Sequence, residues 1–302
     1  MHGLTLRKGG RSDLATVLST LEPFEPRTTH IIGWVLDRGF DRRVTRLWLV
    51  DEPNGDVAGL LVVARQSAER WCAWPYLRDP DAAPVLAPVV EASMAWWIEG
   101  PDQDVAPIRP LLHRAIHRRL KTLPHIAMAP AAPLAPPPEH AGLATAADLD
   151  ELVRLYRHYE LPLAGTRRGL RRVILDRLQR SLVVVARLDG RIVGALWVEV
   201  RSRHYWIATA VTVLPEYRGR GVAWDLANRA LAICEAAGVG IVGVIAETNP
   251  IGPREPADAI GSWRYLTLVP PRRFRGHARL RRMWERLDAI SPRTPEYVRP
   301  DA

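Results

Sequence analysis

Apolar and polar positions in the second half of the chain repeat with two different periods. Helical spacing is carried by Leu149, Leu152, Val153 and Tyr156. Since Asp148 can cap the first turn, we predict a helix over 148–158. A second helical pattern covers 167–180. Runs rich in β-branched residues predict strands over 182–187, 192–200, 204–213 and 240–246, with a helix over 222–237 that stops at Gly238. A short helix is expected after the last strand.

The first half repeats this pattern. A constant shift of 135 residues aligns the two halves without a gap over about seventy positions. Asn54 to Gly59 falls on Asp189 to Gly194, and Ser12-Asp13-Leu14 falls on Ala147-Asp148-Leu149. Trp71 falls on Trp206, and Pro80 on Pro215. Several matches at one shift and in one order indicate a duplicated domain.

A proline-rich segment separates the two copies. Residues 130–138 read PAAPLAPPP, and proline removes backbone donors and favours extended geometry, so we expect a stiff connector there. We therefore predict a first domain over 1–129, a linker over 130–138, a second domain over 139–270 and a basic helix or tail over 271–302.

Composition fits a two-domain protein that lies outside membranes. The 302 residues are 47% hydrophobic and 25% charged, and no long uncharged apolar run predicts a membrane span. The chain start lacks the apolar run of a secretory signal, so a cytoplasmic location is expected. The cysteines, Cys72 and Cys234, lack metal-type spacing; we expect buried reduced thiols and no metal. A net charge of +9 favours anionic partners.

The loop over 214–223 carries the clearest chemical signal. It reads LPEYRGRGVA and joins a predicted strand to a predicted helix. Gly219 and Gly221 let the backbone approach a ligand closely. Amide N–H groups at a helix N-terminus bind anions, and the side chains of Arg218 and Arg220 add charge for phosphates. The loop therefore predicts a pyrophosphate site.

This loop and the strand before it resemble the GNAT superfamily of N-acyltransferases. The family pattern is Arg/Gln-x-x-Gly-x-Gly/Ala after a strand that ends in Val-x-Pro, and Arg218, Gly221 and Ala223 occupy its defining positions. The resemblance implies an α/β (α+β) fold: two GNAT-like domains, each a mixed, mostly antiparallel sheet flanked by helices, with a splayed central strand pair.

The resemblance also implies where the co-substrate acetyl-CoA binds. Backbone groups of Val211 and Val213 would pair with the pantetheine arm and thioester. The pyrophosphate would bind the segment of Arg218, Gly219, Arg220, Gly221, Val222 and Ala223. Asn249 matches the family's asparagine near the cofactor arm. In the first copy the corresponding loop, 79–88, contains three prolines and has Leu86 at the position of Gly221. That copy is therefore expected to lack the anion site and to have a structural or substrate-shaping role.

The catalytic positions of the family are not preserved. Tyr205 stands where many members have a glutamate base, so the candidates for the base are Glu247, Glu199 and His204, in that order. Trp263 takes the position of the usual acid, a tyrosine in a short helix, and Tyr265 follows two residues later as the candidate acid.

Taken together, these features predict an N-acetyltransferase that acts on a primary amine of a small molecule or protein. Two alternatives stay open: a non-catalytic acyl-CoA-binding sensor or scaffold, and an acyltransferase for a nucleic-acid-linked, aminoacyl-tRNA-type substrate. The arginine-rich segment 272–286 is expected to be a solvated helix face, so nucleic acid is not the favoured partner and no membrane partner is expected.

Overall fold

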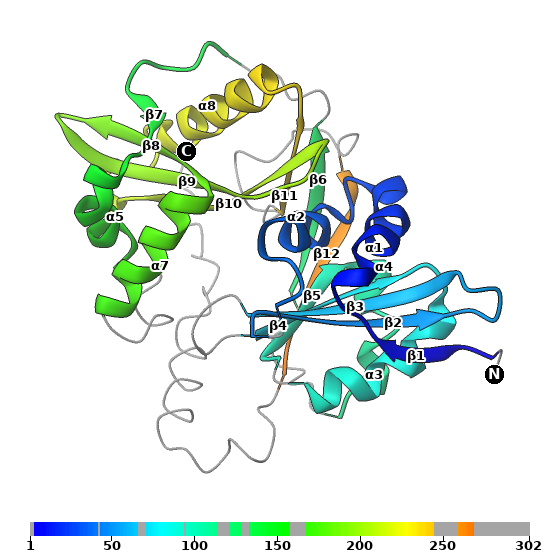
Figure 1. Ribbon diagram of the computed structural model, residues 1–302. Helices are drawn as coiled ribbons and strands as arrows, with labels where there is room; N and C mark the ends of the chain where they lie inside the picture. The colour runs from blue at the N-terminus through cyan, green and yellow to red at the C-terminus, as the bar shows by residue number, and fades with distance from the viewer. Residues whose placement is uncertain are drawn as a thin grey trace, which may run out of the picture.

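The computed structural model describes residues 3–113 apart from 42, 66–70 and 94, and then 121–128, 133, 135–157, 167–244 and 259–268. Strands of both halves join in one twelve-stranded sheet in the order β1-β2-β3-β4-β5-β12-β6-β11-β10-β9-β8-β7. Figure 1 shows β1 to β5 and their helices in blue and cyan, β6 to β10 in green, α8 in yellow and β12 in orange. The described residues contain no helix that is long and apolar enough to cross a membrane.

The first half contributes five consecutive strands and the helices between them. The strands are β1 (Thr5–Lys8), β2 (Thr45–Asp51), β3 (Val57–Arg65), β4 (Trp71–Leu77) and β5 (Trp97–Pro101). The helices are α1 (Leu14–Leu21), α2 (Thr29–Arg38), α3 (Ala83–Ala92) and the single turn α4 (Asp102–Val105). The first four strands pair antiparallel, and β4 pairs parallel with β5.

The second half repeats this order, as the sequence shift predicts. Its elements are β7 (Ala141–Leu143), α5 (Leu149–Tyr156), α7 (Arg167–Arg180), β8 (Leu182–Leu188), β9 (Arg191–Arg201), β10 (Tyr205–Val213), α8 (Val222–Ala236) and β11 (Gly240–Val244). Helix α5 lies 135 residues after α1, and the 3₁₀ turn η7 (Pro215–Tyr217) lies 135 residues after η3 (Pro80–Ala82). The predicted mixed, mostly antiparallel sheet is present in both halves.

Two strands lie in the half opposite to the one expected from their position in the chain. Strand β6 (Lys121–Met128) follows the first half but pairs with β11, whereas β12 (Ala259–Thr267) follows the second half but pairs with β5. The two also pair with each other, which joins the halves into one sheet. The short helix expected near residue 263 is wrong, because this stretch is β12. The boundaries of the domains stay predictions, but each half needs a strand from the other.

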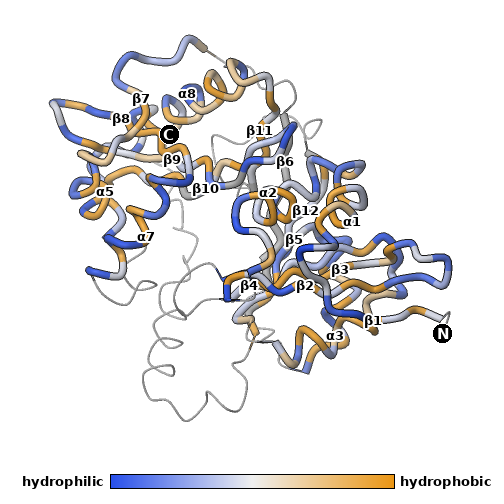
Figure 2. The backbone as a smooth tube through the Cα atoms, viewed as in Figure 1, coloured by the Kyte–Doolittle hydropathy of each residue, from blue (hydrophilic) through white to orange (hydrophobic). Residues whose placement is uncertain are grey.

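Apolar side chains cover both faces of the second half of the sheet. Buried Trp197 and Ala195 face α5 and α7, whereas Val198 and Val213 face Val222 and Leu226 of α8. Figure 2 shows hydrophobic colours along these strands and hydrophilic colours along much of α7. Both cysteines are buried and free, as expected.

Helix α2 belongs to the first half and packs on β9 and β10 of the second. Its apolar residues Ile31, Ile32 and Val35 belong to the first half's core. At its end, Arg38 Nη2 lies 2.9 Å from Asp176 Oδ2 of α7. The first half therefore holds the second from the side on which α7 lies (Figure 1).

Candidate functional site

The parallel pairing of β10 with β11 ends one residue before the last described residue of β11, Val244, and we call the place beside β10 beyond this pairing the β10–β11 gap. The two strands pair in parallel only over Tyr205–Ala208 and Gly240–Gly243, and β10 then continues to Val213 while β11 pairs with β6. The pairing of β10 with β9 shifts register between Thr209 and Thr212, as at a β-bulge. The splayed strand pair that the family resemblance implies would begin at this point, and it stays a prediction. Val211 is exposed beside it, and Val213 is buried.

At the end of β10 the chain passes through η7 into the glycine-containing loop. Gly219 has φ +74° and Gly221, the N-cap of α8, has φ +81°, both in the left-handed region. No heavy atom lies within 4 Å of the position that a Cβ would take at either glycine. The loop is therefore open to a ligand, and the first N–H groups of α8, which lack partners within the helix, lie beside that space.

Charged side chains surround this helix N-terminus. Arg218 and Arg220 are exposed; Arg218 Nε donates to the Val213 carbonyl at 3.2 Å, and the Arg220 guanidinium lies over the Tyr217 ring. The acidic residue of the first turn, Asp225, has Oδ2 3.1 Å from His140 Nε2. Exposed guanidinium groups, a helix N-terminus and left-handed glycines are the features on which an anion site depends, so this loop is the candidate anion site.

The corresponding loop of the first half has a different structure. Helix α3 begins at Ala83, so the positions that correspond to 218–221 are already helical. Leu86, predicted to stand in place of Gly221, is fully buried inside α3. Asp79 caps the preceding turn by accepting from the Asp81 N–H. The exposed glycine loop of the second half has no counterpart in this segment.

The gap between β4 and β5 is filled by the chain itself. These strands pair only at Cys72 and Ala73, and α4 packs against both of them and against β12. The Asp104 carboxylate of α4 accepts the Leu77 N–H at 2.9 Å and lies 3.1 Å from the Arg27 guanidinium. Burial raises the pKa of Asp104 to about 6, although both contacts favour its charged form.

The structure does not bring the predicted catalytic residues together. Glu199 lies beside a register shift of β9, with Oε1 2.9 Å from Arg177 Nε of α7. His204 precedes β10, and its Nδ1 lies 2.8 Å from Oε2 of Glu25, a carboxylate of the first half. His204 and Val213 are nine residues apart, about 30 Å along an extended strand.

The remaining candidates lie elsewhere. Tyr265 is in β12, opposite Glu99 of β5 and Lys121 of β6, three strands from β10. Glu247 and Asn249 lie outside the described residues, as do the basic segment 271–302 and residues 130–132 and 134 of the proline-rich segment. Among described residues no group of three or more His, Cys, Asp or Glu could hold a metal ion.

Sequence reasoning missed three residues beside the two gaps. Asp104 fills the first gap, and Trp197 and Thr209 lie beside the second. No motif marks them, because each becomes notable only through its strand or helix neighbours in space.

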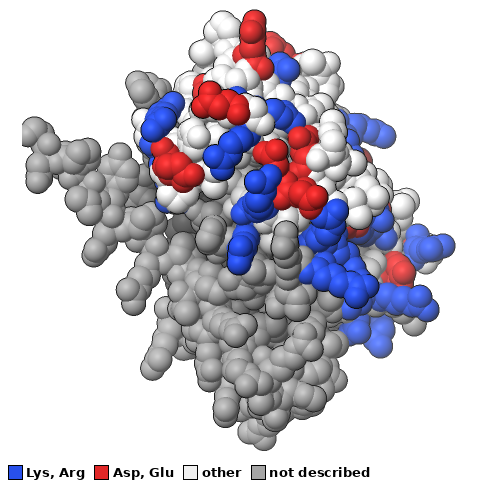
Figure 3. All heavy atoms as spheres, turned by 90° about the vertical axis from the view of Figure 1, so that its left-hand side faces the viewer, with Lys and Arg blue, Asp and Glu red and all other residues white. Residues whose placement is uncertain are grey.

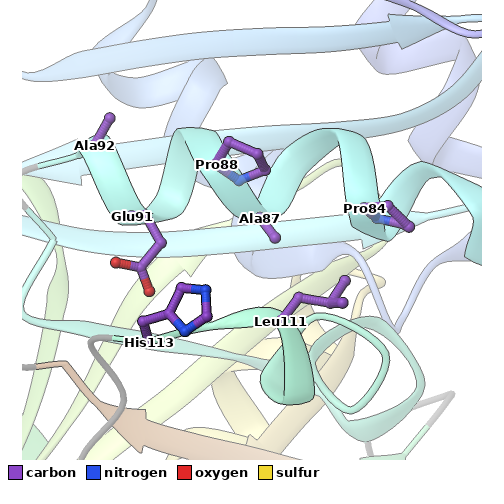
Figure 4. Close-up of a pocket in the computed structure, with 7 residues that line it drawn as sticks. All are labelled: Pro84, Ala87, Pro88, Glu91, Ala92, Leu111 and His113. Atoms are coloured by element: carbon purple, nitrogen blue, oxygen red, sulfur yellow. The ribbon is translucent and has the colours of Figure 1, made fainter.

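A separate groove of about 630 Å³ lies on the first half. Its walls are formed by α3 and the residues after it, with Glu91 and His113 at one end and Pro84 and Leu111 at the other (Figure 4). The groove is away from both the β10–β11 gap and the glycine loop, so it is not the candidate anion site.

Comparison with known proteins finds similarity to acetyltransferases. Residues 147–251 match the acetyltransferase (GNAT) family. The fold is similar to a GCN5-related N-acetyltransferase from Sphaerobacter thermophilus, at 17% identity and TM-score 0.57, over 89% of this chain and 96% of that one. A GCN5-related N-acetyltransferase from Kribbella flavida has 17% identity and TM-score 0.55, over 81% and 95%.

A tandem GNAT protein from the clavulanic acid biosynthesis pathway is also similar, at 15% identity and TM-score 0.53, over 87% of this chain and 98% of that one. Identities this low establish a shared fold. The sequence matches none of the curated proteins, so no substrate follows from a close relative.

Proposed function

Residues 147–251 are an acetyltransferase domain of the GNAT family, and on that premise we propose that this protein transfers an acetyl group from acetyl-CoA to a primary amine. The family domain makes the protein an enzyme of the acyltransferase type. One observation carries the proposal: β10 continues beyond its last pair with β11 and leads into an open, glycine-containing loop on the N-terminus of α8.

In this proposal the cofactor runs along β10. The pyrophosphate binds the N–H groups of the loop from Arg218 to Ala223, where the helix dipole and both arginines favour negative charge. The pantetheine arm enters the gap and pairs with the backbone at Val211 and Val213, which extend beyond the last residue of β10 that pairs with β11. Asn249 would contact the same arm.

The reaction then needs a base for the amine, hydrogen-bond donors that polarise the thioester carbonyl, and an acid for the leaving thiolate. A base takes a proton from the ammonium group, the neutral amine forms a bond to the carbonyl carbon, and the carbon–sulfur bond breaks to release a thiolate that takes up a proton. Glu247 remains our first candidate for the base, because Glu199 is paired with Arg177 and His204 with Glu25. The place of Tyr265, three strands from β10, makes it a weak candidate for the acid.

We further propose a single cofactor site in each chain. The second half supplies the loop and the open gap, whereas α4 fills the first gap and α3 replaces the loop. The first half instead supplies α2, which packs against β9 and β10.

Calorimetric titration with acetyl-CoA tests the cofactor part of this proposal, and one site per chain is expected. Release of free thiol in the presence of a panel of amines tests the enzymatic part. Turnover with any amine excludes the alternative of a non-catalytic sensor or scaffold. Two equivalent cofactor sites, or no binding at all, would contradict the placement of the site.

One observation favours the second candidate, a nucleic-acid-linked acceptor. Helix α7 carries six arginines and one aspartate, and Arg168, Arg171, Arg172 and Arg180 are exposed. Figure 3, which faces the side of α5 and α7, shows Lys and Arg over part of the surface. Among the four exposed arginines, Arg171 and Arg180 lie near carboxylates. Binding of tRNA that weakens steeply with salt, and that Arg168→Gln with Arg172→Gln reduces, would support it.

A further inference from the structure

Two buried polar atoms lie side by side in the sheet without a hydrogen-bond partner. They are Nε1 of Trp197 on β9 and Oγ1 of Thr209 on β10. The whole Trp197 residue is 0% exposed. The two residues are paired directly across the strands, so both side chains point to the same face and their Cβ atoms are about 5 Å apart.

Such groups destabilise a fold, because each has lost its water without gaining a partner. The first half contains the same two side-chain types in the satisfied arrangement. There the Trp34 indole N–H donates to the Thr45 hydroxyl at 2.9 Å, and Thr45 is buried. The same two side-chain types are therefore paired at one place in the first half and unpaired at a different, non-equivalent place in the second.

The unpaired groups lie next to the point at which the pairing of β10 with β11 ends. Thr209 is the first residue of β10 beyond its last pair with β11. It lies four residues, or about 13 Å, from Val213, after which the candidate anion loop (residues 214–223) begins. A pantetheine arm that follows β10 from the N-terminus of α8 would therefore reach Thr209, next to the residues at which β10 and β11 pair.

The face of the sheet on which Trp197 and Thr209 lie indicates which ligand they would contact. Trp197 packs with Tyr156 of α5 and carries the Arg177 guanidinium of α7 over its ring. Helix α8, which holds the cofactor phosphates in our proposal, covers the opposite face. A group that reaches Trp197 and Thr209 therefore approaches the thioester from the side opposite to α8, as the acceptor must if the cofactor occupies the gap.

We propose that Trp197 and Thr209 form a subsite for an oxygen atom of the acceptor amine, an inference that rests on the proposed acetyl transfer. The indole N–H can only donate, so its partner must be a hydrogen-bond acceptor, and the threonine hydroxyl can donate to the same atom. Rotation about the Thr209 Cα–Cβ bond exchanges its methyl and hydroxyl positions, so the hydroxyl can turn toward the gap. The preferred acceptors are amines that carry a carbonyl, carboxylate or hydroxyl oxygen near the amino group.

The test compares acceptors that differ in one oxygen. Propylamine and ethanolamine have the same number of heavy atoms, and glycinamide adds a carbonyl. Wild-type protein is expected to prefer the oxygen-bearing amines in kcat/KM by about fivefold, the worth of one or two neutral hydrogen bonds. Thr209→Val should lower this preference through KM for the acceptor, and Thr209→Ser should retain it.

Stability provides a second readout that a purely structural role would not give. Thr209→Val removes an unpaired buried hydroxyl, so the melting temperature should rise by about 2–4 °C. The control Thr45→Val removes a hydroxyl that Trp34 uses, so it should lower the melting temperature and leave the acceptor preference unchanged.

The two possible failures can be told apart. If wild type acetylates propylamine and ethanolamine equally and Thr209→Val changes neither, the subsite is wrong and the proposed function stands. If no amine is acetylated, the proposed function is wrong, and the subsite is judged by heat stability alone: glycinamide must raise the melting temperature of wild type and not of Thr209→Val. A lower melting temperature of Thr209→Val than of wild type would also overturn the inference.

Discussion

Replacing Asp104 with asparagine removes a buried titratable group from the gap that α4 fills. Asparagine keeps the shape and an oxygen that can accept the Leu77 N–H, but it loses the charge that faces Arg27. The pKa of Asp104 rises from an ordinary value of 3.8 to about 6, mainly because burial disfavours the carboxylate. With about 1.4 kcal/mol for each pKa unit, ionisation of Asp104 costs the folded state about 3 kcal/mol.

The sign follows from proton binding. Because the folded-state pKa is raised, the folded protein binds more protons than the unfolded chain between about pH 4 and pH 6. The stability contributed by protonated Asp104 is therefore fully present below about pH 4 and is lost as pH rises through about 6. Asp104→Asn cannot titrate, so wild type should lose stability relative to this variant over that window, by up to about 3 kcal/mol.

Urea unfolding of both proteins at a series of pH values, followed by tryptophan fluorescence, measures this difference. Subtracting the variant from wild type at each pH cancels the titration of all other groups. A difference that stays flat from pH 4 to pH 7, or wild type that gains relative stability as pH rises, would refute the reasoning. It would then follow that Arg27 and the Leu77 N–H outweigh burial.

Three further predictions concern the second half and its contact with the first. Gly221→Glu should weaken acetyl-CoA binding at least about tenfold, or 1.4 kcal/mol, whereas Gly190→Glu, at a hairpin glycine that also has positive φ and open space, should leave calorimetric affinity unchanged. Glu247→Gln should keep acetyl-CoA binding and lower turnover; a wild-type rate in the thiol assay would exclude it as the base. Arg38→Ala should cost less than about 1 kcal/mol in urea unfolding, because its pair with Asp176 is partly exposed, and a larger loss would show that this contact holds the halves together.

The local part of the second half could be predicted from its residues. Helix α5 lies within the predicted range, α7 and β10 match theirs within one residue, and α8 starts at Val222 as predicted. These features depend on short-range causes: helical or alternating spacing of apolar side chains, and glycines at positions that need a left-handed backbone. The candidate anion loop could be proposed for the same reason, since its glycines and arginines are neighbours in the chain.

Only the tertiary structure decided which strands pair and which residues meet at the gaps. Neither β6 nor β12 was predicted as a strand, and no local pattern says which neighbour a strand will have, because strand pairing joins residues far apart in sequence. Residues 263–267 were therefore expected to form a helix in the second half. In the structure they belong to β12 and pair with β5 of the first half. The carboxylate of Asp104 in one gap, and Thr209 beside Trp197 at the other, follow from that pairing and from the packing of α4 and α7, which no spacing in the sequence records.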